Sequence, residues 1–135
     1  YHGSSAVIEY AVCVLGVKHI IVCGHSHCGA CKSLYQDLGE TPDLINVKKW
    51  LDLGKRAKEY TLLAIQDKSD PEKLYRATEK ISVVHQMENL LTFPYVERKV
   101  KSGEIQIHGW YYRIEDGTIE YYDGEECSFK PLQEK

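Results

Sequence analysis

The segment Val22-Cys23-Gly24-His25-Ser26-His27-Cys28-Gly29-Ala30-Cys31 decides the fold of this 135-residue chain. It begins at the end of an apolar, β-branched run over residues 17–23, which predicts a strand buried on both faces in a parallel sheet. His25 and Cys28 come three positions apart, in a glycine-flanked turn after that strand. A neutral imidazole and a thiolate both suit Zn²⁺, a borderline-soft cation. We therefore predict that His25 and Cys28 are metal ligands.

The residues around this pair leave two chemistries open. Cys28 would lie near the start of a helix predicted over residues 31–38, where the partial positive charge favours a thiolate. The His-x-x-Cys spacing alone is a weak metal signature, which the strand, the glycines and the helix strengthen. His27 is expected to point away from the metal. Cys31 forms a Cys-x-x-Cys motif with Cys28, so a thiol redox site is the alternative.

Working outward, the predicted order is helix, strand, helices, strand, strand. Helices are predicted over residues 4–15, 31–38, 41–67 with a break at Gly54, from Asp70-Pro71 to Pro94, and over 95–101. Their apolar stripes are Val7, Ala11, Val14 and Leu15 in the first helix, and Leu74, Ala77, Ile81, Val84 and Leu91 in the long one. On that long helix, His85, Gln86 and Glu88 are interpreted as solvated.

The carboxyl-terminal part predicts a hairpin. Residues 105–114 and 118–122 are predicted strands joined by a turn at Asp116-Gly117, and the tail after Gly124 is predicted irregular. The fold class is α/β: a parallel β-sheet core flanked by helices, with a C-terminal antiparallel hairpin, in a single domain over residues 1–135. Helical crossovers should join the parallel strands, and ligands should collect at the carboxyl ends of those strands.

Composition excludes several classes of function. The formal net charge is −3 and the pI is about 6.1, so neither nucleic acid nor a membrane surface is an expected partner. No apolar run approaches the ~18 residues that span a bilayer. Five cysteines, an odd number, predict a reducing compartment, with cytoplasm as the expected location. Cys13 and Cys23 are predicted to be small buried hydrophobes.

The chain resembles the β-class carbonic anhydrases. The resemblance is carried, in order along the chain, by residues 5–12, 17–21, 23–30, 83–90, 94–96, 109–112 and 117–119. It implies reversible hydration of CO₂ to bicarbonate and a proton, by attack of zinc-bound hydroxide on the carbon. His25 and Cys28 match the second and third of three zinc ligands. Gly29 matches a small residue that leaves room for substrate, and Tyr10 matches a tyrosine that lines the active-site cleft.

The resemblance also predicts what surrounds this part of the enzyme. The family's first zinc cysteine and its accompanying Asp-Arg pair belong to a segment upstream of Gly3, so we expect the chain to be the C-terminal portion of an N-terminally incomplete fold. Water, Cys31 or a neighbouring chain would complete the metal site, and activity of this form would be low. An unpaired sheet edge and the family's assemblies predict a homodimer or a dimer of dimers. A non-catalytic zinc-binding scaffold is a further alternative.

Overall fold

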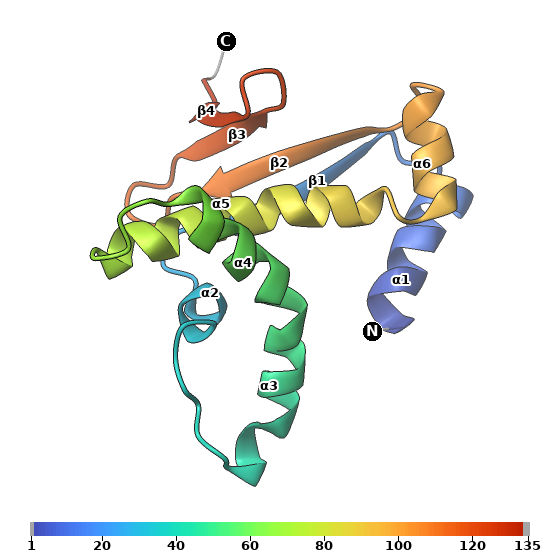
Figure 1. Ribbon diagram of the computed structural model, residues 1–135. Helices are drawn as coiled ribbons and strands as arrows, with labels where there is room; N and C mark the ends of the chain where they lie inside the picture. Colours follow the sequence, from blue (N-terminus) through green and yellow to red (C-terminus); the bar gives the residue numbers. More distant parts are fainter. Residues whose placement is uncertain (1, 134–135) are drawn as a thin grey trace.

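The computed structural model describes residues 2–133, and its centre is one four-stranded sheet in the order β1-β2-β3-β4 (Figure 1). Strand β1 (His19–His25) pairs in parallel with β2 (Gln106–Tyr112). Strand β3 (Ile119–Asp123) then returns antiparallel to β2, and β4 (Ser128–Pro131) returns antiparallel to β3. The predicted parallel pair with a helical crossover and the predicted hairpin are both confirmed.

The helices lie before β1 and within the long crossover to β2. They are α1 (His2–Glu9), the π-helical turn η1 (Tyr10–Val14), α2 (Gly29–Ser33), η2 (Pro42–Leu44), α3 (Ile45–Leu51), η3 (Asp52–Gly54), α4 (Lys55–Ala64), α5 (Pro71–Leu90) and α6 (Pro94–Lys101). The predicted break at Gly54 and the predicted stop before Pro94 are confirmed. Helix α2 starts and ends earlier than the predicted 31–38.

Helix α5 begins where its sequence indicates. The Asp70 carboxylate accepts hydrogen bonds from the backbone N–H groups of Glu72 and Lys73, and Pro71 occupies the first turn. The helix then crosses the sheet at close range, because Gly24 of β1 and Gly109 of β2 have no side chain in the way. A Cβ atom on Gly24 would lie 2.5 Å from Cγ2 of Val83. These glycines set the distance between α5 and the strands that carry the site.

Only one face of β1 is covered, which corrects the prediction of a strand buried on both faces. Exposure alternates along β1, with Ile20 and Val22 packed against the core cluster while Ile21 and Cys23 are exposed. Helix α5 covers the first face, and within residues 2–133 nothing buries the second to the same extent. The prediction that Cys23 and Cys13 are buried is therefore wrong, since both thiols are exposed.

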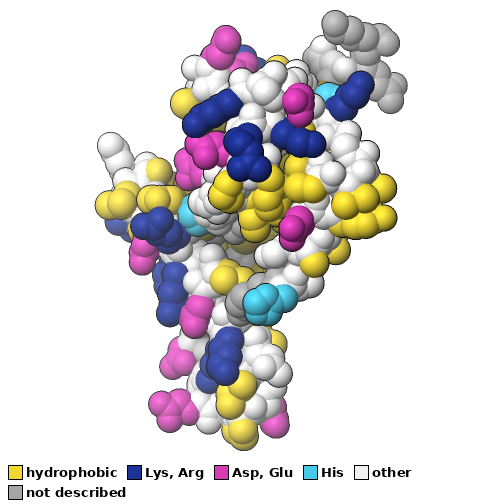
Figure 2. All heavy atoms as spheres, turned by 90° about the vertical axis from the view of Figure 1, so that its right-hand side faces the viewer, with side chains coloured by type: hydrophobic (Ala, Val, Ile, Leu, Met, Phe, Trp, Pro, Cys, Tyr) yellow, Lys and Arg dark blue, Asp and Glu magenta, His cyan; other side chains and the backbone are white. Residues whose placement is uncertain are grey.

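The first helix differs from its predicted apolar stripe. The backbone N–H of Leu15 bonds to the carbonyl of Tyr10 at 3.0 Å, five residues back, as in a π-helix. The wider turn changes the face that meets the core, so Val12 is fully buried while Val7 and Val14 are exposed. Figure 2 shows hydrophobic side chains gathered on the surface at the α1 and α6 end of the molecule.

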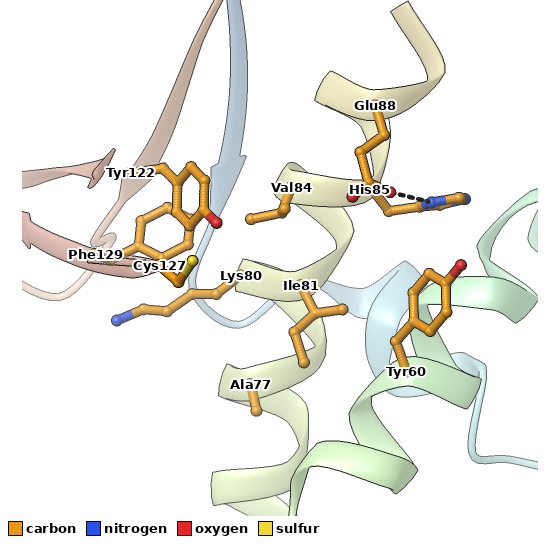
Figure 3. Close-up of a pocket in the computed structure, with 10 residues that line it drawn as sticks. All are labelled: Tyr60, Ala77, Lys80, Ile81, Val84, His85, Glu88, Tyr122, Cys127 and Phe129. Carbon is orange, nitrogen blue, oxygen red and sulfur yellow. Dashed lines mark ion pairs between the residues drawn. The ribbon is translucent and has the colours of Figure 1, made fainter. Parts of the chain in front are cut away.

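The apolar stripe of α5 is also displaced from its predicted position. Ala77, Ile81 and Val84 line an open hollow of about 550 Å³ between α4 and the β3–β4 pair (Figure 3). His85, predicted to be solvated, is only 6% exposed and packs edge-on against the Tyr60 ring. The buried positions of α5 include the polar residues Thr78, Glu79 and His85, which a search for an apolar stripe does not find.

The tail after Gly124 is not irregular, which corrects another prediction. Residues Ser128–Pro131 form β4, whose pairing with β3 runs from Asp123 opposite Ser128 to Glu120 opposite Pro131. The Phe129 ring lies 5.4 Å from the Tyr122 ring, centroid to centroid. This contact between paired strands supplies the apolar packing that a four-residue strand needs.

Candidate metal centre

His25 and Cys28 meet at the carboxyl end of β1. His25 is the last residue of β1, which runs two residues beyond the predicted strand end at Cys23, so His25 belongs to the strand and not to the predicted turn. Cys28 immediately precedes α2. Both line a small cavity of about 190 Å³ between β1 and α5. Its other lining residues are Val22, Cys23, Gly24, Cys31, Glu79, Ser82, Val83 and Gln86. The carboxyl ends of parallel strands are where open α/β sheets bind their ligands.

The His25 ring is held in one tautomer. Its Nδ1 atom lies 2.8 Å from the backbone carbonyl oxygen of Ser26. A carbonyl can only accept a hydrogen bond, so Nδ1 carries the proton and Nε2 keeps its lone pair. Metal-bound histidines use this arrangement, in which one ring nitrogen donates to a carbonyl and the other binds the metal.

Cys28 is held through its main chain and lies beside a second thiol. Its backbone N–H donates a 2.8 Å hydrogen bond to Oε1 of Glu79. The thiol of buried Cys31 is hydrogen-bonded to Cys28, and burial with the adjacent sulfur charge raises the pKa of Cys31 to about 12. Cys31 therefore stays protonated and can donate its S–H to the Cys28 sulfur.

Sequence reasoning missed Glu79, a carboxylate only 2% exposed on the sheet side of α5. Its Oε1 also accepts a 2.9 Å hydrogen bond from Arg76, and its Oε2 accepts one of 2.7 Å from the Tyr111 hydroxyl. Burial and this hydrogen bond to Glu79 raise the pKa of Tyr111. The Arg76–Glu79 spacing of three residues was the one local signal, and it equally describes an ordinary surface ion pair.

A second set of contacts holds the residues between the ligands. Ser26 is buried and its hydroxyl donates to Glu115 Oε2 at 2.7 Å. His27 adopts a left-handed backbone conformation, with φ of 55°. Its Nδ1 accepts from Arg76 at 2.9 Å, so its Nε2–H donates to Glu115 Oε1 at 2.8 Å. As predicted, His27 does not line the cavity.

The two residues expected to border the substrate have different positions. Gly29 is the first residue of α2, and a Cβ atom added there would meet nothing within 4 Å. Tyr10 begins the π-helical turn, is 56% exposed, and is not among the residues that line the cavity. The α1 end of the molecule lies at the opposite end of β1 from α2 (Figure 1). Within one chain, Tyr10 is therefore remote from His25 and Cys28.

The donor set agrees with the chemistry of zinc but is incomplete within the described part of the chain. An imidazole nitrogen with a free lone pair and a cysteine sulfur are the ligand types that zinc prefers. Among residues 2–133, no group of three or more histidine, cysteine or acidic side chains is placed to hold a metal ion. The described residues thus bring two candidate donors, His25 and Cys28, to one cavity.

Comparison with known proteins identifies the family of this chain. A family model described as carbonic anhydrase matches residues 1–119. A carbonic anhydrase of Pseudomonas aeruginosa is 39% identical over 132 residues, which cover 98% of this chain and 59% of that protein. One of Synechocystis is 36% identical over 124 residues, 90% of this chain and 44% of that protein. The solved β-carbonic anhydrase CcaA superposes with a TM-score of 0.81 at 33% identity, over 97% of this chain and 58% of that one.

The sheet and its flanking helices, with the matching family model, define a carbonic anhydrase fold. The chain belongs to the β class of that family. It spans about half the length of the curated relatives it matches. Among residues 2–133, no helix combines the length and the apolar character needed to cross a membrane.

Proposed function

We propose that this chain supplies the His25 and Cys28 side of a Zn²⁺ site that catalyses the reversible hydration of CO₂ to bicarbonate and a proton. One observation carries the proposal: both side chains line the same cavity at the end of β1, and each is held by a hydrogen bond to the surrounding main chain or to α5. A bound Zn²⁺ supplies a Lewis acid that makes a water molecule nucleophilic near neutral pH. Since no third histidine, cysteine or acidic side chain among residues 2–133 is placed to complete the site, water, Cys31 or a neighbouring chain would supply the remaining donor.

The residues of this chain prepare that site in three ways. The Ser26 carbonyl keeps the proton on Nδ1 of His25, which leaves Nε2 free to bind. The Cys31 thiol stays protonated and can donate its S–H to the Cys28 sulfur. Gly29 directly follows Cys28 and borders open space, since an added Cβ atom would meet nothing within 4 Å, and we assign to it the role of admitting CO₂ and releasing bicarbonate.

Tyr10 would act from a second copy of the chain. It is exposed and remote from the cavity of its own chain, so a role at the active-site cleft requires a neighbouring subunit. The exposed apolar side chains of Val7, Val14 and Leu15 surround it on the same segment and support self-association. One structural neighbour, from Sordaria macrospora at 28% identity and a TM-score of 0.74, is described as tetrameric. We therefore propose a homodimer or a dimer of dimers.

Native mass spectrometry of the purified chain tests the metal site directly, because it reports bound zinc and assembly together. One zinc per chain that disappears in His25→Ala and Cys28→Ser is the expected result. Stopped-flow CO₂ hydration then measures the activity of the same samples, and we expect a rate below that of a complete relative. A metal-free wild-type chain would overturn the proposal and favour a non-catalytic scaffold.

The contact between Cys28 and Cys31 supports a second candidate, a dithiol redox site. The two thiols are close enough to hydrogen-bond, as a disulfide-forming pair must be. Against this candidate, Cys31 is buried and its raised pKa keeps it in the unreactive thiol form.

All five cysteines are free, which supports a reducing compartment and the proposed cytoplasmic location.

A further inference from the structure

We propose that Glu79 is a positioning residue for the metal site: its carboxylate holds the main chain of Cys28 so that the cysteine sulfur faces the cavity. This inference rests on the proposed function, since it assigns a role around the same ligand pair. Glu79 lies 51 residues after Cys28, on α5, and its Oε1 accepts the Cys28 N–H at 2.8 Å. Both residues line the cavity: Cys28 from the loop that follows β1, and Glu79 from α5.

The Glu79 carboxylate is itself held on every side. Arg76 forms a hydrogen bond to Oε1 at 2.9 Å and an ion pair with Oε2 at 2.9 Å. The Tyr111 hydroxyl, on β2, donates to Oε2 at 2.7 Å. A buried carboxylate with this many donors has little freedom to move. The Glu79 carboxylate is therefore a fixed group between α5 and the sheet. The loop of residues 26–28, here called the metal loop, is attached to it.

Arg76 extends the same attachment to the other side of the loop. Its guanidinium donates to Nδ1 of His27 at 2.9 Å, while His27 donates to Glu115 at 2.8 Å. The loop that carries the ligands is thus tied to α5 at Cys28 and at His27, through two adjacent side chains of one helical turn. His25 needs no such tie, because it belongs to β1 and its position follows from the strand.

The local sequence alone does not hold Cys28 in place. Cys28 has an extended backbone, with φ of −70° and ψ of 114°, and precedes a helix of only five residues. So short a helix contributes little rigidity by itself. In metal sites, losing a partner that orients a ligand costs about 10- to 100-fold in metal affinity. We expect Glu79 to have an effect of that size.

Three variants separate positioning from simple structural support. Glu79→Met keeps the approximate volume but removes both acceptor oxygens, and we expect the Kd for Co²⁺ to rise about tenfold or more. Glu79→Gln retains one acceptor oxygen for the Cys28 N–H and should restore most of the affinity. Glu72→Gln is the matched control, because Glu72 is an exposed carboxylate on the same helix that also pairs with Arg76. Its Kd should equal that of the wild type.

The measurement is a Co²⁺ titration followed through the thiolate-to-cobalt charge-transfer band, well below the unfolding temperature of each variant. Unchanged affinity in Glu79→Met beside a metal-binding wild type would overturn this inference and leave the proposed function standing. A wild type without the band would overturn both. Should Glu79→Met fail to fold, amide exchange in the ¹⁵N-cysteine-labelled wild type decides: a protected Cys28 N–H supports the inference, and a freely exchanging one overturns it.

Discussion

The Ser26 hydroxyl donates a 2.7 Å hydrogen bond to Glu115 Oε2, although the two residues lie 89 positions apart. The same hydroxyl oxygen accepts the backbone N–H of Ile114 at 2.8 Å. These contacts fasten the loop between His25 and Cys28 to the turn that joins β2 and β3. Since His27 also donates to Glu115, this carboxylate orders the side of the metal loop that faces away from the cavity.

Glu115 should make the stability of the fold depend on pH. The hydrogen bond from Ser26, followed by its own backbone and His27, lowers the pKa of Glu115 from 4.5 to about 2. Its contribution is therefore fully present above pH 4.5 and is lost as the pH falls toward 2. We expect Glu115→Gln to unfold at a lower temperature than the wild type at pH 7, with the difference shrinking across that window. Thermal unfolding followed by circular dichroism measures it.

The control for this prediction is Glu104→Gln, which changes an exposed carboxylate between α6 and β2. It should follow the wild type at every pH. An equal loss of stability in Glu115→Gln at pH 2 and at pH 7 would show that the carboxylate charge is not what matters.

The two thiols of the Cys-x-x-Cys motif should have different importance for metal binding. Cys28→Ser removes a ligand, so zinc measured by native mass spectrometry should be lost. Cys31→Ser removes only the neighbour that hydrogen-bonds to Cys28, and we expect zinc to remain with an affinity lowered by about tenfold or less. The reverse result, or an intramolecular disulfide that forms in air and expels the metal, would favour the redox candidate.

Gly24 should tolerate no side chain, because α5 lies directly above it. A methyl group there would approach Cγ2 of Val83 to 2.5 Å, and Val83 is a buried, β-branched residue that cannot rotate away freely. We expect Gly24→Ala to lower the free energy of unfolding by about 1–3 kcal/mol in urea titrations.

Two further variants check the cause of that loss. Gly124→Ala serves as the control, since an added Cβ there meets nothing within 4 Å, and it should be neutral. Combining Gly24→Ala with Val83→Ala relieves the clash, so the double variant should lose less than the two single losses added together. Strict additivity would mean that the 2.5 Å contact is not the cause.

Self-association should depend on the exposed apolar side chains of the first helical segment. Val14 is 64% exposed at the end of η1, and Val14→Glu places a charge where we propose that a second copy packs. We expect the mass from light scattering to fall from a dimer or larger assembly to a monomer. Leu63→Glu on α4 is the control, because Leu63 is more exposed, at 85%, and lies on another surface. Equal dissociation by both variants would contradict the proposed interface.

Local patterns predicted the elements whose causes are local. Asp70 and Pro71 mark the start of α5 because a cap and a first-turn proline act on the neighbouring backbone. Gly117, with φ of 71°, marks the turn between β2 and β3 because glycine adopts that conformation without strain. His25 and Cys28 were identifiable for the same reason, since a strand end and a short turn bring them together.

Other features depend on contacts that no local pattern contains. Glu79 is read from sequence as an ordinary helix carboxylate, and only the crossing of α5 over the sheet places it against Cys28 and Tyr111. The burial of His85 likewise follows from its packing against Tyr60 of a different helix. Strand β4 exists because β3 offers it an edge and an aromatic surface.

By itself, the sequence determined the family and the order of the elements as far as β3, and it predicted His25 and Cys28 as metal donors, because short stretches of the chain carry each of these signals. The tertiary structure decided which face of each element is buried, what holds Cys28 in position, and that Tyr10 lies away from the cavity of its own chain. The physical reason is the same in all three cases. Periodicity records the geometry of one helix or strand, whereas burial and long-range hydrogen bonds depend on which surfaces meet after the chain has crossed from β1 to β2.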